Sequence, residues 1–154
     1  MAVFIFDTSG LVKRHVTETG STWVRSLTHA KSAHTIYIAR ITVVEITSAI
    51  TRRQRGGTLS PAQAAAMLGH FRRHVTQRYL ILEMTLPLLA EATRSARAHG
   101  LRAYDAVQLA AALEAERIYQ PVGLGPVTLI SADRELNAAA IAEGLTVDDP
   151  NNHP

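Results

Sequence analysis

The chain has 154 residues, of which 47% are hydrophobic and 19% are charged, and none is a cysteine. This length and composition suit one compact domain with its own core, and they exclude a disulfide framework and any cysteine-based zinc site. The 16 Lys and Arg residues outnumber the 13 Asp and Glu residues, and the formal net charge of +3 by itself favours a nucleic-acid partner only weakly.

No stretch approaches the roughly 18–20 apolar residues that a membrane span needs, so we expect no membrane partner. The start of the chain, MAVFIFD, has no basic leader and reaches an acid at Asp7, which argues against a signal peptide. Together with the absence of cysteine, these features predict a cytoplasmic protein. We expect one domain over residues 1–150 and a loose C-terminal tail over residues 151–154.

Short apolar runs predict strands at residues 2–6, 34–39, 78–85, 127–131 and, for a short fifth strand, 145–149. Helical patterns lie between them, at residues 9–16, 20–30, 42–55, 60–75, 86–100 and 102–119. Gly56-Gly57 is a helix-stop signal, and Ser60-Pro61 is an N-cap followed by a first-turn proline. The alternation predicts an α/β fold with a mostly parallel central sheet of four to five strands, covered by helices on both faces.

Polar residues at the strand ends are candidate site residues, because parallel sheets bind ligands beyond the carboxyl ends of their strands. Further candidates are the acids near the starts of two helices. In chain order the candidates are Asp7, Arg40, Thr42, Glu45, Asp105, Ser131 and Asp133.

Three of the four acids have ordinary local explanations when each is taken alone. Asp7 can be the N-cap of the helix that follows it. Glu45 fits a capping box in which Thr42 is the cap, and Asp133 fits the first turn of a helix capped by Ser131. None of these three acids therefore indicates a site by itself.

Asp105 is harder to explain locally. It shares a helical face with Leu109, Ala112 and Leu113, and that face should point inward. An ionised carboxylate there carries a desolvation cost of several kcal/mol unless a cation, a donor or a metal balances it. In a purely structural explanation, Arg102 is the partner that balances it.

Taken together, the four acids come from segments that should meet at one edge of the sheet. Clustered carboxylates repel one another, and they stay ionised together only around a cation. Hard oxygen ligands select Mg²⁺ or Mn²⁺ rather than zinc. Because such ions can orient a water, lower its pKa and stabilise a departing oxygen, the pattern indicates phosphodiester hydrolysis.

Four motifs carry a family resemblance: FIFDTSG, TVVEITSAI, RAYDAVQLAAAL and TLISADREL. They resemble those of the PIN-domain nucleases, and within them those of the VapC-like toxins of prokaryotic toxin–antitoxin pairs. The resemblance covers nearly the whole chain, and AYDAVQLAAAL is its most specific part. It implies a three-layer α/β/α sandwich, a Mg²⁺- or Mn²⁺-dependent endoribonuclease that is a homodimer, and inhibition by a small antitoxin protein.

The resemblance also implies roles for individual residues. The acidic quartet that would be catalytic and hold the metal is Asp7, Glu45, Asp105 and Asp133. Asp7 and Asp105 would be direct metal ligands, and Glu45 would bind a metal or position the water. The remaining aspartate, Asp133, would complete the outer wall of the acidic site, often by acting through a water molecule. Thr8 and Ser131 would support the site by hydrogen bonding.

Several basic residues are candidate RNA contacts. Arg40 and Arg102 could reach a phosphate near the acids, although a solvated or internally paired arginine is the more ordinary explanation of each. The basic clusters TRRQR (51–55) and FRRH (71–74) could guide RNA or attract an acidic antitoxin tail. The seven histidines are scattered without an HExxH motif, so we expect surface or partly buried residues.

Two other functions stay open. Aspartyl-phosphate chemistry at Asp7, as in a phosphatase-like α/β domain, would need a second nearby Asp and a Lys after a later strand. Position 9 is Ser9, however, and the only lysines are Lys13 and Lys31. The other alternative is a non-catalytic PIN-like module that binds RNA or protein, against which four converging acids argue.

Overall fold

The computed structural model describes residues 1–123 and 125–154. In this part of the chain, the strands are β1 (Val3–Phe6), β2 (Thr35–Ala39), β3 (Tyr79–Leu82), β4 (Val127–Ile130) and β5 (Thr146–Asp148). The α-helices are α1 (Thr8–Leu11), α2 (Ser21–Leu27), α3 (Arg40–Arg55), α4 (Pro61–Gln77), α5 (Leu86–His99), α6 (Ala103–Tyr119) and α7 (Arg134–Ala142). Short 3₁₀ turns are η1 (Val12–Arg14), η2 (Gln120–Val122) and η3 (Pro150–Asn152).

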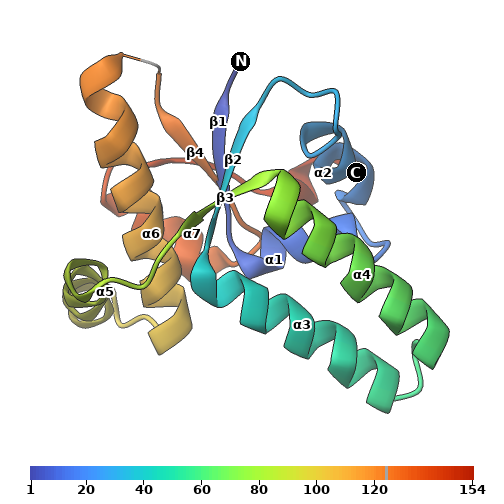
Figure 1. Cartoon of the computed structure of the whole chain (residues 1–154). Coiled ribbons are helices and arrows are strands. Elements are labelled where there is room, and N and C mark those ends of the chain that lie inside the picture. The colour runs from blue at the N-terminus through green and yellow to red at the C-terminus, as the bar shows by residue number, and fades with distance from the viewer. Residues whose placement is uncertain (124) are drawn as a thin grey trace.

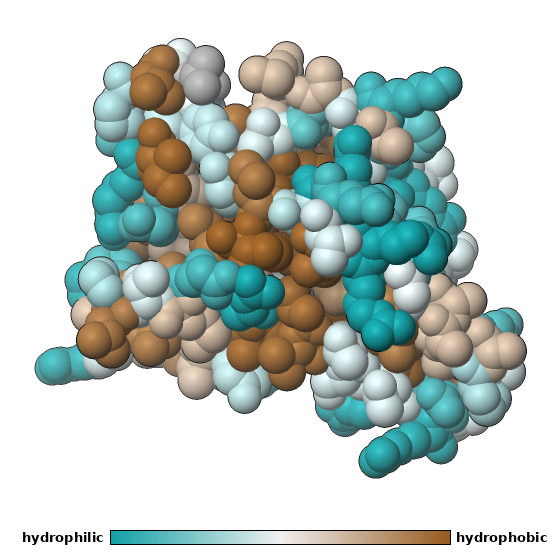
Figure 2. Space-filling view, in the orientation of Figure 1, coloured by the Kyte–Doolittle hydropathy of each residue, from teal (hydrophilic) through white to brown (hydrophobic). Residues whose placement is uncertain are grey.

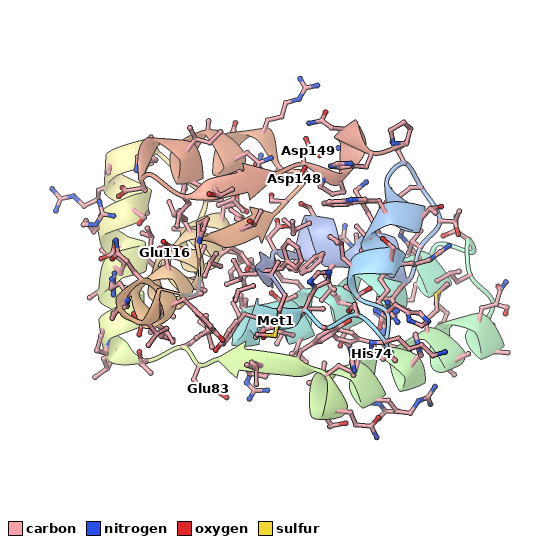
Figure 3. The ribbon with its side chains drawn as sticks, turned by 90° about the horizontal axis from the view of Figure 1, so that it is seen from above. Met1, His74, Glu83, Glu116, Asp148 and Asp149 are labelled. Carbon is pink, nitrogen blue, oxygen red and sulfur yellow. The ribbon has the colours of Figure 1, made fainter. Side chains whose placement is uncertain are left out.

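The strands form one sheet in the order β3-β2-β1-β4-β5, and every pair is parallel. The predicted α/β fold is confirmed, with five strands among the described residues. Figure 3 shows Glu83, which follows β3, and Asp148, in β5, at opposite edges of the sheet. Phe6, the last residue of the central strand β1, is in register with Ile38 of β2 and Ile130 of β4. The carboxyl ends of the three central strands therefore meet.

Helices cover both faces of this sheet and produce three layers (Figure 1). Successive residues of β1 point to opposite faces. Val3 and Ile5 pack in a core with α5, α6 and α7, whereas Phe6 packs in a second core with α2, α3 and α4. Burial on both faces explains why the strands are continuous apolar runs in the sequence. Among the described residues, no helix combines the length and the apolar character needed to cross a membrane.

The start of α3 differs from the prediction. The helix begins at Arg40, two residues early, and its N-cap Ala39 makes no side-chain bond. The capping-box interpretation of Thr42 and Glu45 is therefore wrong, because both residues already lie inside the helix. A capping box does form at α4, where Ser60 is the N-cap as predicted. Glu45 is thus available for contacts outside its own helix.

The C-terminal residues are packed, contrary to the expectation of a loose tail over residues 151–154. Lys13 Nζ donates to Asn151 Oδ1 at 3.0 Å. The ring of His153 stacks on Trp23, with the centroids 3.9 Å apart. These contacts join the end of the chain to segments more than 100 positions away, which local composition does not reveal.

Candidate functional site

The end of β1 and the end of β4 are joined directly. Asp7 N donates to Ile130 O at 3.2 Å, one residue beyond the last paired position of β1. Gly10, in α1, lies so close to Ile130 that a Cβ on it would come 2.4 Å from the same carbonyl oxygen. Glycine at this position therefore lets α1 pack against the end of β4, next to the loop that follows that strand.

The carboxylate of Asp7 is only 4% exposed and caps α1, as the local explanation predicted. Oδ1 accepts from Gly10 N at 2.8 Å, and Ser9 Oγ lies 2.9 Å from both carboxylate oxygens. Burial nonetheless raises the pKa of Asp7 to about 7, because desolvation outweighs these hydrogen bonds, and the negative charge of Asp133 adds to the rise. A buried acid that titrates near neutrality is typical of a functional site.

Ser9 connects this carboxylate to the loop after β4. Its hydroxyl, which can both donate and accept, accepts from Ala132 N at 2.9 Å in addition to its contact with Asp7. The sequence analysis did not identify Ser9 as a site residue, because its partner lies 123 positions along the chain. Its place two residues after a strand-terminal acid is the only local signal.

The loop after β4 positions Asp133. Ser131 is fully buried, and its Oγ accepts from Asp133 N at 3.1 Å. Asp133 is itself the N-cap of α7, because its Oδ1 accepts from Leu136 N at 2.9 Å. The predicted assignment of Ser131 as the cap is wrong, whereas its hydrogen bond to the segment that carries the acid agrees with a supporting role.

Glu45 is held by two side chains, one from each of two other elements. Thr8, in α1, donates its hydroxyl proton to Glu45 Oε2. Gln108, in α6, places Nε2 3.0 Å from the same oxygen, 2.9 Å from Thr42 Oγ1 and 3.3 Å from Thr8 Oγ1. This network fixes the Glu45 carboxylate of α3 relative to both α1 and α6, so the orientation of Glu45 depends on all three helices.

Gln108 is a second site residue that the sequence analysis missed. It is 2% exposed, and its two amide hydrogens face three oxygen acceptors. Its Oε1 is buried without a partner among the described residues. A polar residue three positions after Asp105, within the apolar run of residues 106–113, was the available signal, since residues at i and i+3 share a face.

Asp105 lies in the first turn of α6 and is partly buried. Burial raises its pKa, as do the charges of Asp133, Glu45 and Glu135, whereas Arg102 lowers it. Arg102 is exposed and does not cancel the effect of the acids. The purely structural explanation, in which Arg102 balances the inward-facing carboxylate, therefore accounts for only part of the environment of Asp105.

The four predicted acids lie within electrostatic range of one another. Asp133 acts on both Asp7 and Asp105, and Glu45 also acts on Asp105. Asp7 and Asp133 follow the ends of β1 and β4, Glu45 lies in the second turn of α3, and Asp105 lies in the first turn of α6. The structure therefore concentrates negative charge at the carboxyl edge of the sheet, as the positions of the acids in the sequence predicted.

The donor chemistry fits a hard divalent cation, because every candidate ligand is an oxygen and burial disfavours the ionised acids in the absence of a cation. Within residues 1–123 and 125–154, however, no three His, Asp or Glu side chains are arranged as a ready metal-binding group. Asp7 and Asp133 accept capping bonds, and Glu45 accepts bonds from Thr8 and Gln108. Only one oxygen of Glu45 and one of Asp133 accept these bonds, so each carboxylate keeps acceptor capacity.

The two candidate RNA-binding arginines differ in their contacts. Arg40 forms an ion pair with Glu83, in which Nε lies 3.0 Å from Oε2 and the second guanidinium nitrogen contacts Oε1. This pair is exposed, so it contributes little to stability and can be exchanged for a phosphate. Arg102 is exposed at the N-cap position of α6, beside the acids.

A surface cavity of about 380 Å³ opens beside Glu45. Its lining includes Thr8 and Glu45 from the site, Val44 and Arg52 from α3, and Tyr104 from α6. The cavity therefore connects the carboxylate network to the outer face of α3, where a ligand larger than a water molecule has room.

Comparison with known proteins agrees with this geometry. The family model described as the PIN domain matches residues 4–142. Among solved structures, PAE2754 from Pyrobaculum aerophilum has a TM-score of 0.64 at 22% identity, covering 98% of this chain and 91% of that chain. VapBC2 from Rickettsia felis, bound to a DNA fragment from their promoter, has a TM-score of 0.62 at 14% identity, covering 96% and 98%.

VapC20 from Mycobacterium tuberculosis, described as a sarcin-ricin loop cleaving toxin, has a TM-score of 0.61 at 15% identity, covering 90% of this chain and 95% of that chain. At these identities the structural likeness supports the fold alone. No curated protein sequence matches the chain significantly. The family match spans nearly the whole chain and includes all four strand-end and helix-start acids, so the chain belongs to the PIN-domain family.

Proposed function

We propose that the protein is a Mg²⁺- or Mn²⁺-dependent endoribonuclease that hydrolyses RNA phosphodiester bonds. The observation that carries the proposal is the set of four acids from separate segments that gather at one sheet edge, where Asp7 is buried with a pKa of about 7. A non-catalytic scaffold gains nothing from this arrangement, because like charges in a poorly hydrated place oppose folding. Members of the PIN family are typically nucleases that bind a divalent metal.

In the proposed site, Asp7 and Asp105 would hold the cation directly, Glu45 would bind it or position the attacking water, and Asp133 would complete the outer wall. A divalent cation supplies a water of lowered pKa and stabilises charge on the departing oxygen. Ser9 orients Asp7, and Thr8 orients Glu45. Preorganised ligands of this kind reduce the reorganisation that catalysis requires.

We further propose that the ribonuclease is the toxin of a toxin–antitoxin pair, a cytoplasmic homodimer that a small antitoxin inhibits. The support is the structural likeness, at low identity, to VapBC2 and to FitAB bound to an IR36 DNA fragment. The FitAB structure has a TM-score of 0.64 at 18% identity.

Sequencing of RNA 5′ ends after brief expression of wild type beside Asp7→Ala tests the RNA target. New 5′ ends at defined positions, present only with the wild type, are expected.

One observation favours the non-catalytic alternative. The carboxylates of Asp7, Glu45 and Asp133 already accept protein hydrogen bonds, and no ready metal-binding group is found among the described residues. Aspartyl-phosphate chemistry has less support, because Lys13 is held by Thr19 O at 2.9 Å and by Asn151, away from Asp7.

Cleavage of RNA by purified protein separates these functions. Wild type should cleave single-stranded RNA with Mn²⁺ or Mg²⁺, lose activity in EDTA, and regain it when metal is restored. Asp105→Asn should abolish cleavage, because a neutral amide is a poor ligand for a hard cation. It should leave the free energy of unfolding equal or higher, because it removes a charge that burial and neighbouring acids oppose.

The controls decide between the functions. Glu114→Gln changes a half-buried acid farther along the same helix, and this variant should retain activity. Cleavage that ignores EDTA would contradict the metal mechanism. Weak Mn²⁺ binding without cleavage of any RNA would support the non-catalytic module instead, and unfolding of Asp105→Asn would assign Asp105 a structural role.

A further inference from the structure

We propose that a single strand of RNA follows the outer face of α3, leading from Glu45 to Arg55, with Arg52 and Arg55 on its phosphates and Tyr104 stacked on a base. The inference rests on the proposed ribonuclease function and extends it to the path of the substrate. It is carried by the shape, the charge and the aromatic residue of one continuous groove.

The groove consists of two adjoining hollows that share Val44, Ser48 and Arg52. The first hollow is the cavity of about 380 Å³ that contains Glu45. The second, of about 480 Å³, continues along α3 as far as Arg55. At 1.5 Å per helical residue, Arg52 lies about 10 Å and Arg55 about 15 Å beyond Glu45 along the helix. The groove therefore extends from Glu45 for a distance that suits a short nucleic-acid strand.

The charge of the α3–α4 hairpin favours a polyanion as the occupant. Residues 40–78 contain seven arginines and a single acid, Glu45, which itself lies at the site. The side chains of Arg52 and Arg55 are exposed, and no described acid forms an ion pair with either. Figure 2 shows hydrophilic side chains over much of α4, whereas the far end of the hairpin, at the lower right, is mixed. Unpaired guanidinium groups of this kind bind phosphate well.

Tyr104 supplies the stacking surface. It is 57% exposed, it lines the first hollow opposite α3, and it directly precedes Asp105. An exposed ring that no core packing explains is suited to stack on a base of any identity. A base on Tyr104 would place the adjoining phosphate near the acids.

The test measures binding without cleavage. A fluorescently labelled single-stranded RNA oligonucleotide is titrated, in EDTA, into full-length protein carrying Asp105→Asn, and anisotropy is recorded at several salt concentrations. Arg52→Ala and Arg55→Ala should each weaken binding and reduce the slope of log K against log salt by about 0.7. Tyr104→Leu should weaken binding by about ten-fold or more with the slope unchanged.

Arg72→Ala and Arg73→Ala are the matched controls, because they remove the same charge from exposed positions of α4 that line neither hollow. They should change affinity and slope less than the α3 variants. Equal effects of both pairs, or no RNA binding at all, would overturn the proposal.

A protein occupant is the other outcome that would overturn it. In that case Val44→Asp would change the sedimentation mass or abolish binding of a partner protein, while RNA affinity stayed unchanged. Failure of the proposed function gives a different result. Wild type that binds RNA through the groove and never cleaves it would refute the proposed nuclease activity, while the proposed RNA path along α3 would stand.

Discussion

At the scale of single residues, the site depends on side chains that burial would ordinarily penalise. Asp7 remains buried because Ser9 and Gly10 donate to it, although desolvation still raises its pKa to about 7. Gln108 is nearly inaccessible and connects Glu45 to two other elements. Replacing such a residue costs more stability than its own hydrogen bonds contribute, because buried partners are left unsatisfied.

Gln108→Leu should lower the free energy of unfolding by about 1–3 kcal/mol, because it removes the only donor from α6 to Glu45 and Thr42 within a buried network. Urea unfolding checks this change. If Gln108 positions Glu45, the same variant should also weaken Mn²⁺ binding measured by calorimetry. Gln77→Leu, at the exposed end of α4, is the control and should stay within about 0.5 kcal/mol of wild type. A Gln108→Leu protein with unchanged stability and Mn²⁺ affinity would contradict the role.

At the scale of elements, α4 is docked on an unusual cluster of imidazoles. The His15 ring lies 5.7 Å from that of His70, which lies 4.4 Å from that of His74. Arg14 contacts His74 Nε2 at 3.3 Å. The sequence analysis expected scattered surface or partly buried histidines, and the expectation missed the cluster because His15 comes from a different segment. His74, labelled in Figure 3, belongs to α4.

This cluster should make stability fall in acid. Burial lowers the pKa of His15 to about 3 and that of His74 to about 4, and the positive charges of Arg14, Arg25, Arg73 and Arg78 act in the same direction. Both pKa values are below the unfolded value of 6.5. Between the folded pKa and pH 6.5, the unfolded chain therefore binds more protons than the folded chain. The stabilisation is complete above pH 6.5 and is lost as pH falls, by up to about 1.4 kcal/mol per pH unit for buried His15 and by less for His74, whose charge solvent screens.

Urea unfolding at pH 7 and pH 5 measures this loss. His15→Leu removes one titrating group, so its stability should decline less between the two pH values than that of wild type. His29→Leu changes an exposed histidine outside the cluster and should decline as wild type does. An identical decline for all three proteins would show that His15 is not the titrating group.

The elements themselves follow local rules closely. The helix predicted at residues 102–119 is observed as α6 over Ala103–Tyr119, and Ser60 caps α4 as predicted. The start of α3 was misplaced because Thr42 and Glu45 satisfy the spacing of a capping box without forming one. Spacing identifies residues that could bond, whereas the backbone conformation decides whether they do.

At the scale of the whole molecule, the C-terminal residues pack against the N-terminal part of the chain. His153, near the C-terminus, stacks on Trp23 of α2, and its Nε2 lies 2.8 Å from Asp148 Oδ1 at the end of β5. The contact between Lys13 and Asn151 joins the same two regions. The edge strand β5 is thereby held to the N-terminal half of the chain.

His153→Ala should lower the free energy of unfolding by about 0.5–1.5 kcal/mol, because it removes an aromatic pair. Trp23 is the only tryptophan, so its fluorescence reports the loss of the stacked ring directly. Asn152→Ala, an exposed neighbour, should leave both stability and emission unchanged. Unchanged emission in His153→Ala would mean that the tail does not rest on α2.

The sequence alone determined the strands, the long helices, the parallel class of sheet and the positions of the four acids, because periodicity and capping act over a few residues. Tertiary structure decided the strand order, the contacts of Ser9 and Gln108, the pairing of Arg40 with Glu83 and the docking of the tail. These contacts join residues up to 138 positions apart. They depend on which elements become neighbours when both faces of the sheet are buried, and no local pattern encodes that choice.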